Sequence, residues 1–228
     1  KLIKYYSLIN HNLIFNNKSI NRYNKNQPNI QKDKALSLKR LRDDIKDIKD
    51  CKLKESASNL VFSDGYPDSK VMIIGEGPGA NEDKEGLPFV GRAGQLLDKM
   101  LNAINLNREK VYITNVVNYR PPENRKPTEK EVERYLPYLK RHIEIVKPKI
   151  ILLLGSTAMN AILGKTEVIS KMRGKWHEFK INKLKIYSIV SFHPAYLLRQ
   201  PDQKKFSWID LKMIRDKIEK LNIKIEKY

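Results

Sequence analysis

The sequence contains a single cysteine, Cys51, among its 228 residues. One thiol cannot form an intrachain disulfide, and it cannot supply the four thiolates of an iron–sulfur cluster. Long apolar runs are also missing, because stretches such as residues 150–154 fall far short of the roughly 20 residues that span a bilayer. The first residues lack the apolar core and cleavage site of a secretory signal. These absences predict a cytoplasmic protein without a membrane span.

Negative charge is scarce relative to positive charge. Lys and Arg number 45 against 26 Asp and Glu, which gives a formal net charge of +19 at pH 7. Such an excess predicts attraction to polyanions, either nucleic acid or an anionic membrane. Because lysine-rich and asparagine-rich usage can also follow from AT-rich coding, the charge indicates the sign of the partner without identifying it.

The composition divides the chain near residue 34. Residues 1–33 contain eight Asn and six Lys or Arg, with apolar residues at no steady period, which predicts a basic, low-complexity and flexible arm. Residues 34–228 are expected to form one domain, since this length suits a single hydrophobic core. An amphipathic helix should open that domain, because its apolar residues recur at helical spacing: Leu38, Leu41, Ile45 and Ile48.

Four short apolar segments alternate with helical patterns: residues 70–75, 111–117, 149–155 and 185–192. Each has the length of a strand and lacks strict polar alternation, as expected of strands covered on both faces. The pattern predicts an α/β fold with three layers, α/β/α, around a central four-stranded, mostly parallel sheet. Ligands of such sheets bind at the carboxyl ends of the strands. Thr128 and Glu131 form a capping box that should start one helix, and Pro137 should kink it. Another helix should start after Ser156, and an apolar stripe in residues 211–221 indicates a last one.

A glycine-rich turn, Gly-Glu-Gly-Pro-Gly at residues 75–79, follows the first predicted strand. Glycine lets backbone N–H groups approach a ligand closely. The turn lacks the Gly-Lys-Ser/Thr ending of a P-loop and the glycine spacing of a dinucleotide site, so it indicates neither. Taken alone, it is equally consistent with a tight structural turn.

Three residues with suitable chemistry follow this turn. Phe89 lies in a loop rich in Pro and Gly, where its ring can stack on a flat base or simply belong to the core. Asn115 ends the second strand, where its amide can read a pyrimidine edge or cap the strand. His193 ends the fourth strand, where it can donate to an oxygen that gains charge or merely occupy a turn.

Four collinear segments resemble the family 4 uracil-DNA glycosylases of bacteria and archaea, within the wider uracil-glycosylase superfamily: residues 75–83, 89–94, 115–122 and 191–199. The resemblance covers roughly residues 50–220. It implies that Phe89 stacks on an extruded uracil, that Asn115 reads its N3 and O4 edge, and that His193 donates to O2. The backbone groups that line the pocket would belong to Gly75, Glu76 and Gly77.

The resemblance also implies hydrolysis of the N-glycosidic bond. Cleavage leaves negative charge on uracil, mostly shared with O2, while the sugar becomes oxocarbenium-like. A nearby carboxylate would steady this cation or orient the attacking water, and the candidates are Glu76 and Glu82. Either glutamate can instead cap a loop or the following helix. Ala80 stands where some superfamily members have Asp or Glu.

Further residues would meet DNA beside the flipped base. The resemblance implies that Leu197 or Leu198 wedges into the duplex and that Arg199 holds a phosphate, with Arg120 as another DNA contact. The alternative is that the two leucines simply support a helix.

The chain departs from the family in its cysteines. Family members typically hold an iron–sulfur cluster with four cysteines, and motif spacing assigns those positions here to Cys51, Lys54, Tyr119 and Tyr135. We therefore expect no 4Fe-4S cluster and no other metal or cofactor, with the tyrosines filling the vacated volume.

These expectations describe a monofunctional uracil-DNA glycosylase that leaves an abasic site, since no motif places a lysine for a lyase step. Its partner would be uracil-containing DNA, in the cytoplasm and associated with the nucleoid, without an obligate protein partner. The alternative is a DNA-binding module of the same fold that holds uracil or abasic DNA with little or no turnover. A general nucleic-acid-binding protein would share the charge but would not need Asn115 and His193 together.

Overall fold

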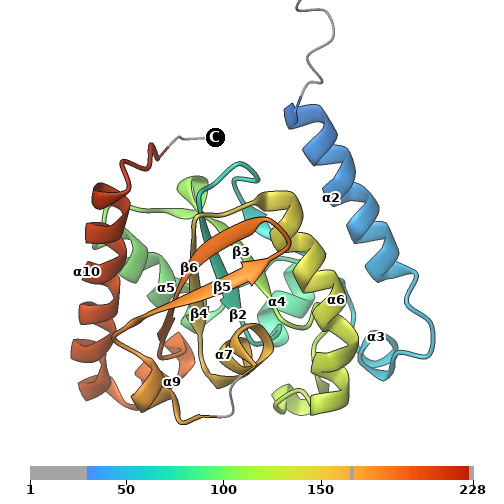
Figure 1. Ribbon diagram of the computed structural model, residues 1–228. Helices are drawn as coiled ribbons and strands as arrows, with labels where there is room; N and C mark the ends of the chain where they lie inside the picture. Colours follow the sequence, from blue (N-terminus) through green and yellow to red (C-terminus); the bar gives the residue numbers. More distant parts are fainter. Residues whose placement is uncertain (1–29, 165–166, 226–228) are drawn as a thin grey trace, which may run out of the picture. The chain divides into compact units, whose positions relative to one another are not determined.

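The structure is a computed structural model that describes residues 30–164 and 167–225 (Figure 1). One compact unit is Lys34–Tyr228. Most of the predicted arm, residues 1–29, lies outside the described residues, so its flexibility stays a prediction. The first described helix, α2 (Ile30–Lys46), already begins within the last residues of that predicted arm.

The sheet has six strands in the order β1-β3-β2-β4-β6-β5. The four central strands are parallel to one another, which confirms the predicted parallel sheet, and the two outer strands are antiparallel to their neighbours. The strands are β1 (Asp64–Gly65), β2 (Val71–Gly75), β3 (Tyr112–Asn115), β4 (Ile150–Leu154), β5 (Trp176–Ile181) and β6 (Leu184–Ser191).

The predicted number of four strands omitted both edges of the sheet. Strand β1 is only two residues long, which is too short to leave a pattern. Strand β5 mixes charged and aromatic residues because it forms an edge, where exposed positions interrupt the apolar run. It joins β6 through a tight turn in which Asn182 adopts a φ of 50°, a conformation that Asn tolerates better than most residues.

Helices cover both faces of the sheet, as the three-layer prediction requires (Figure 1). One face packs against residues of α2, α3 (Lys52–Ser56), α6 (Glu129–Val146), α7 (Ser156–Leu163) and α8 (Ile169–Met172). The other face packs against α5 (Arg92–Asn102), α9 (Pro194–Arg199) and α10 (Lys204–Lys220). The remaining short helices are α4 (Ala80–Glu85), η2 (Arg108–Lys110), η3 (Pro122–Asn124) and η4 (Pro201–Gln203).

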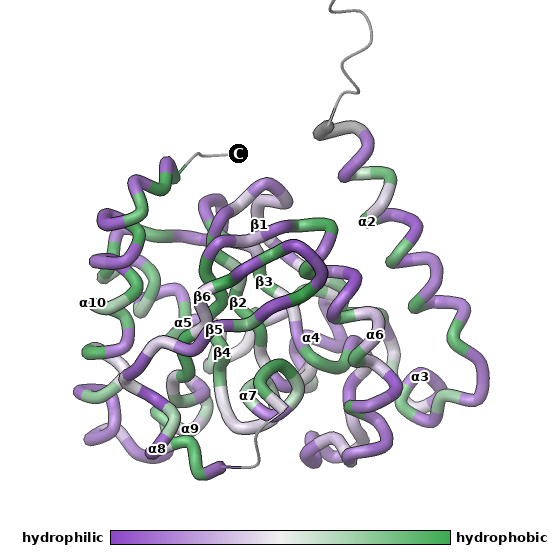
Figure 2. Tube along the Cα trace, viewed as in Figure 1, coloured by the Kyte–Doolittle hydropathy of each residue, from purple (hydrophilic) through white to green (hydrophobic). Residues whose placement is uncertain are grey.

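Strand β2 shows why the central strands carry no polar alternation. Val71 and Ile73 belong to the core on one face, whereas Met72 and Ile74 belong to the core on the other. Because both faces are buried, every position of the strand is apolar, and Figure 2 shows the same continuous hydrophobic colour along β4. Each such side chain contributes roughly 1.5–3 kcal/mol relative to an exposed one.

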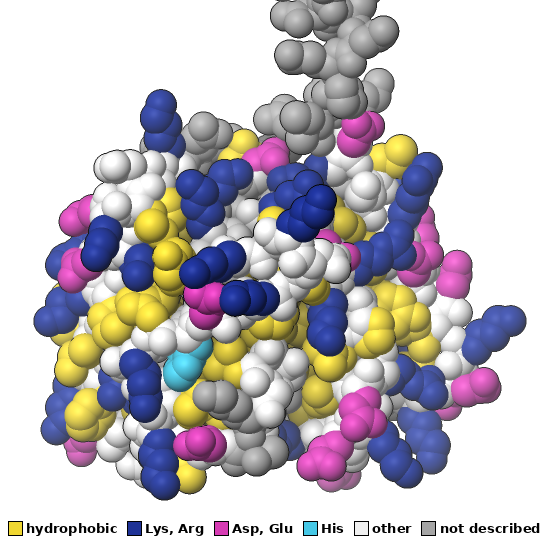
Figure 3. Space-filling model, in the orientation of Figure 1, with side chains coloured by type: hydrophobic (Ala, Val, Ile, Leu, Met, Phe, Trp, Pro, Cys, Tyr) yellow, Lys and Arg dark blue, Asp and Glu magenta, His cyan; other side chains and the backbone are white. Residues whose placement is uncertain are grey.

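The predicted capping box at the start of α6 is confirmed. The Glu131 N–H donates to Thr128 Oγ1 at 3.3 Å, and the Thr128 N–H donates to Glu131 Oε2 at 2.7 Å. Pro137 lies inside α6, which continues through it as one helix. Among the described residues, no helix is long and apolar enough to cross a membrane. Figure 3 shows Lys and Arg spread over the visible face between acidic and apolar side chains, so charge alone marks no binding surface there.

Candidate active site

The carboxyl ends of the parallel strands surround a cavity of about 200 Å³. The register aligns them, with Gly75 of β2 opposite Asn115 of β3, and Leu154 of β4 opposite Ser191 of β6. The cavity is lined by Glu76, Gly77, Pro78, Gly79, Glu82, Phe89, Ala93, Asn115, Pro121, Asn124, Arg125, Pro127, His193 and Ala195. The structure thus brings together six predicted residues from three separate parts of the sequence: Glu76, Gly77, Glu82, Phe89, Asn115 and His193.

Gly75, the seventh predicted pocket residue, does not line the cavity. A Cβ atom at this position would overlap Asn115 Oδ1 and the ring of Phe89. Glycine is therefore required here because these two side chains occupy the space that any larger residue would need. Gly75 acts by making room for the pocket residues.

Asn115 presents an unpaired acceptor. Its side chain is only 3% exposed, and its Oδ1 is buried without a hydrogen-bond partner. Buried polar atoms in folded proteins nearly always have a partner, and an unpaired one costs about 1–3 kcal/mol. Asn118, three residues further on and equally buried, instead donates its amide to Val61 O at 3.0 Å. Asn115 thus keeps a buried acceptor unpaired beside the cavity, at a cost in stability.

His193 is a neutral hydrogen-bond donor. Its Nδ1 accepts the N–H of Ala195 at 3.2 Å, so the proton of the neutral ring lies on Nε2. Burial, and to a lesser extent the positive charge of Arg199, lower the pKa of His193 from 6.5 to about 4, against a smaller opposing effect of Glu82. The ring therefore carries no charge at neutral pH and stacks on Phe89, with the centroids 5.6 Å apart.

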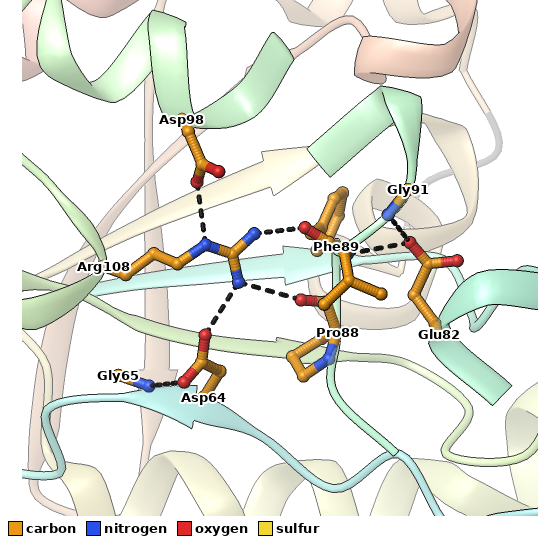
Figure 4. Close-up of polar contacts among 9 residues, drawn as sticks. Asp64, Gly65, Glu82, Pro88, Phe89, Gly91, Asp98 and Arg108 are labelled. Carbon is orange, nitrogen blue, oxygen red and sulfur yellow. Dashed lines mark hydrogen bonds and ion pairs between the residues drawn. The ribbon is translucent and has the colours of Figure 1, made fainter. Parts of the chain in front are cut away.

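Glu82 joins the glycine turn to the loop that carries Phe89 (Figure 4). One carboxylate oxygen accepts the N–H groups of Val90 at 2.9 Å and Gly91 at 2.8 Å. The other accepts the N–H of Gly79 at 3.1 Å. Three backbone N–H groups thus donate to this carboxylate, which indicates that Glu82 holds the two segments in place.

Glu76, the other predicted carboxylate, has a different environment. It lines the cavity, and its Oε2 accepts a hydrogen bond from the Thr157 hydroxyl at the start of α7. Sequence reasoning did not single out Thr157, and only the crossing of α7 over β2 brings it to Glu76.

The segment after β3 supplies further residues that the prediction missed. Pro121, Asn124, Arg125 and Pro127 all line the cavity. Their signal in the sequence was a short proline-rich segment directly after the strand that carries Asn115. Arg120, predicted to contact DNA, does not line the cavity and donates to Asn124 Oδ1 at 2.8 Å.

The two leucines that were predicted as alternative DNA wedges differ in burial. Leu197 is 1% exposed and points from α9 into the hydrophobic core, so the structure contradicts a wedge role for it. Leu198 is 37% exposed, and Arg199 beside it is exposed as well. The prediction of a DNA contact in α9 therefore narrows to Leu198 and Arg199.

Comparison with known proteins shows which family the chain belongs to. The sequence model described as the Uracil DNA glycosylase superfamily matches residues 62–216, well over half of the chain. The chain belongs to the uracil DNA glycosylase superfamily. Among its superfamily relatives, a type-4 uracil-DNA glycosylase of Sulfurisphaera tokodaii is 43% identical over 185 residues, covering 79% of this chain and 84% of the relative.

Other superfamily relatives show the same similarity. A type-4 uracil-DNA glycosylase of Saccharolobus solfataricus is 38% identical, covering 82% of this chain and 88% of the relative. One of Thermotoga maritima is 44% identical, covering 68% of this chain and 80% of the relative.

The iron–sulfur cluster that the resemblance to family 4 implies does not fit the residues present. Cys51 Sγ lies 3.2 Å from the Tyr135 hydroxyl, in the core cluster that also contains Tyr119. Lys54 Nζ donates to the carbonyl groups of Lys46 and Ile48 instead. One thiol, a lysine and two tyrosines cannot replace the four thiolates that hold such a cluster. In the described part of the chain, no group of three or more His, Cys, Asp or Glu side chains is arranged to hold a metal ion.

Proposed function

We propose that this chain is a monofunctional uracil-DNA glycosylase that flips uracil out of DNA and hydrolyses its N-glycosidic bond. The observation that carries this proposal is Asn115, a residue that lines the cavity and whose buried Oδ1 has no hydrogen-bond partner. The N3–H of uracil is a donor that satisfies this acceptor, while the amide N–H of Asn115 can donate to O4. Cytosine offers an acceptor at N3 and a donor at its amino group, so the same amide disfavours it. The type-4 names of the relatives support this substrate.

Binding in this proposal relies on two further features of the pocket. The Phe89 ring stacks on the flat face of uracil, a contact worth roughly 1–3 kcal/mol per base. Exposed Leu198 enters the space that the flipped nucleotide leaves, and Arg199 and Arg120 contact phosphates. These contacts hold the base where Asn115 and His193 can act on its edges.

Cleavage breaks the bond between C1′ and N1, and the electron pair remains on uracil, mostly shared with O2. The Nε2–H of neutral His193 donates to O2 as this charge develops, an effect of roughly 10²–10³ in rate. A water molecule then bonds to C1′ of the oxocarbenium-like sugar. The Glu76 carboxylate orients this water and accepts its proton, which passes on to solvent or to the uracil anion.

The products of this reaction are free uracil and an abasic site. A lyase step needs an amine that attacks C1′, and no lysine occurs among the described residues that line the cavity. We propose that the enzyme works without a cluster or metal and without an obligate protein partner. We also propose that it acts on uracil-containing DNA in the cytoplasm, in association with the nucleoid.

A strand-cleavage assay tests the proposal. End-labelled oligonucleotides with one uracil, and matched ones with thymine, are incubated with the protein and then treated with alkali, which breaks the strand at abasic sites. We expect breaks in the uracil strand and none in the thymine control. Intact uracil strands under an excess of protein would overturn the enzymatic function, and retained binding to them would then favour the DNA-binding module.

A further inference from the structure

Phe89 has an uncommon backbone conformation. Its φ is +56°, in the left-handed region that residues with side chains rarely adopt, so surrounding contacts must offset the strain. In this conformation the buried ring lies between Gly75 and His193. A Cβ atom at Gly94 would overlap the Phe89 carbonyl group, so helix α5 packs directly on this backbone. The loop is therefore held tightly although it lacks regular structure.

Arg108 accounts for much of this restraint (Figure 4). Its Nη1 donates to Pro88 O at 3.0 Å, and its Nη2 donates to Phe89 O. The guanidinium group is itself anchored by two carboxylates, with Nε 2.8 Å from Asp98 Oδ1 and Nη1 2.7 Å from Asp64 Oδ2. Three nitrogens in one plane thus tie β1, α5 and the Phe89 loop together. A lysine, with one nitrogen, cannot reproduce this geometry.

We propose that Arg108 is a positioning residue for uracil recognition, which acts by holding Phe89 in the backbone conformation that presents its ring to the base. Arg108 does not line the cavity, so its effect on the reaction passes through Phe89. Glu82 restrains the other end of the same loop through Val90 and Gly91. The inference deepens the proposed function and rests on it, because it assumes that Phe89 stacks on uracil.

The test is a double-mutant cycle with Arg108→Lys and Phe89→Leu, measured as KM and kcat on the uracil oligonucleotide. Stacking stabilises bound uracil in the ground state and in the transition state alike, so we expect Arg108→Lys to act mainly by raising KM. The expected loss in kcat/KM is about tenfold or more. In the Phe89→Leu background the same substitution should change kcat/KM less than about twofold, because the residue on which it acts is gone.

Arg134→Lys is the matched control. Arg134 also holds two successive carbonyl groups, donating to Lys49 O at 3.0 Å and to Asp50 O at 2.7 Å, and Asp50 likewise has a positive φ of 51°. Its carbonyl partners do not line the cavity. We expect Arg134→Lys to leave KM and kcat unchanged, even if it lowers the melting temperature as much as Arg108→Lys does.

The outcomes separate the two proposals. An inactive wild-type protein would overturn the function itself. An active wild type with an unchanged KM in Arg108→Lys, or with equal losses in both backgrounds of the cycle, would overturn the role of Arg108 alone. If Arg108→Lys folds poorly, Asp98→Ala removes one anchor while Arg108 remains, and the same cycle then applies, with an unchanged KM again counting against the proposal.

Discussion

Asn115 and Asn118 offer a prediction in which two buried amides of the same segment respond in opposite directions. Leucine has the same number and branching of side-chain heavy atoms as asparagine but no hydrogen-bonding groups. Asn115→Leu removes the unpaired Oδ1, whose burial costs about 1–3 kcal/mol, so the free energy of unfolding should rise by about 1 kcal/mol. Asn118→Leu removes the donor to Val61 O and leaves that carbonyl unpaired, so the free energy of unfolding should fall by about 1–3 kcal/mol.

Urea unfolding followed by circular dichroism at pH 7 measures both changes, provided that the slope m stays constant. In parallel, the strand-cleavage assay should show that Asn115→Leu lowers kcat/KM by at least about a hundredfold, since the donor and the acceptor for the uracil edge are both gone. The combination of greater stability with lost activity is expected of a group retained for a ligand. If Asn115→Leu destabilises the protein as much as Asn118→Leu does, Asn115 Oδ1 has a hydrogen-bond partner in the folded protein and the reasoning is refuted.

Three further predictions concern histidine and glutamate side chains. His193→Ala should lower kcat by roughly 10²–10³ with little change in KM, in single-turnover assays, because the hydrogen bond to O2 strengthens as charge develops. Glu76→Gln should lower kcat by about a hundredfold or more and leave the free energy of unfolding unchanged. Glu82→Gln should instead lower the free energy of unfolding by about 1–2 kcal/mol, because the backbone N–H of Gly79 then faces an amide N–H. The reverse result would exchange the roles of the two glutamates. Burial lowers the pKa of His142 to about 3 from 6.5, so the unfolded chain binds the extra proton and stability falls as the pH drops below 6.5. Between pH 7 and pH 5 the wild type should lose about 2 kcal/mol more than His142→Gln in urea unfolding, and equal losses would contradict the shift.

Much of the site could be predicted because parallel strands end at one edge of a sheet. Once the apolar segments were assigned to strands, Glu76, Asn115 and His193 had to follow strand ends and converge there. The edge strands were missed because one is too short to leave a pattern and the other is half exposed. Missing these edge strands does not alter the predicted pocket, which lies at the carboxyl ends of the central strands.

The sequence alone determined the chemistry of the pocket, since residue types and their order after each strand specify which donors and acceptors can meet. It could not assign the two glutamates, which differ only in partners contributed by distant segments: backbone N–H groups for Glu82 and Thr157 for Glu76. The tautomer of His193 depends likewise on a hydrogen bond. Only the tertiary structure decided these points, because a side chain's role follows from which of its hydrogen-bonding groups remain free after folding. Arg108 shows this most clearly, since no local pattern links it to the strained Phe89 whose carbonyl group it holds.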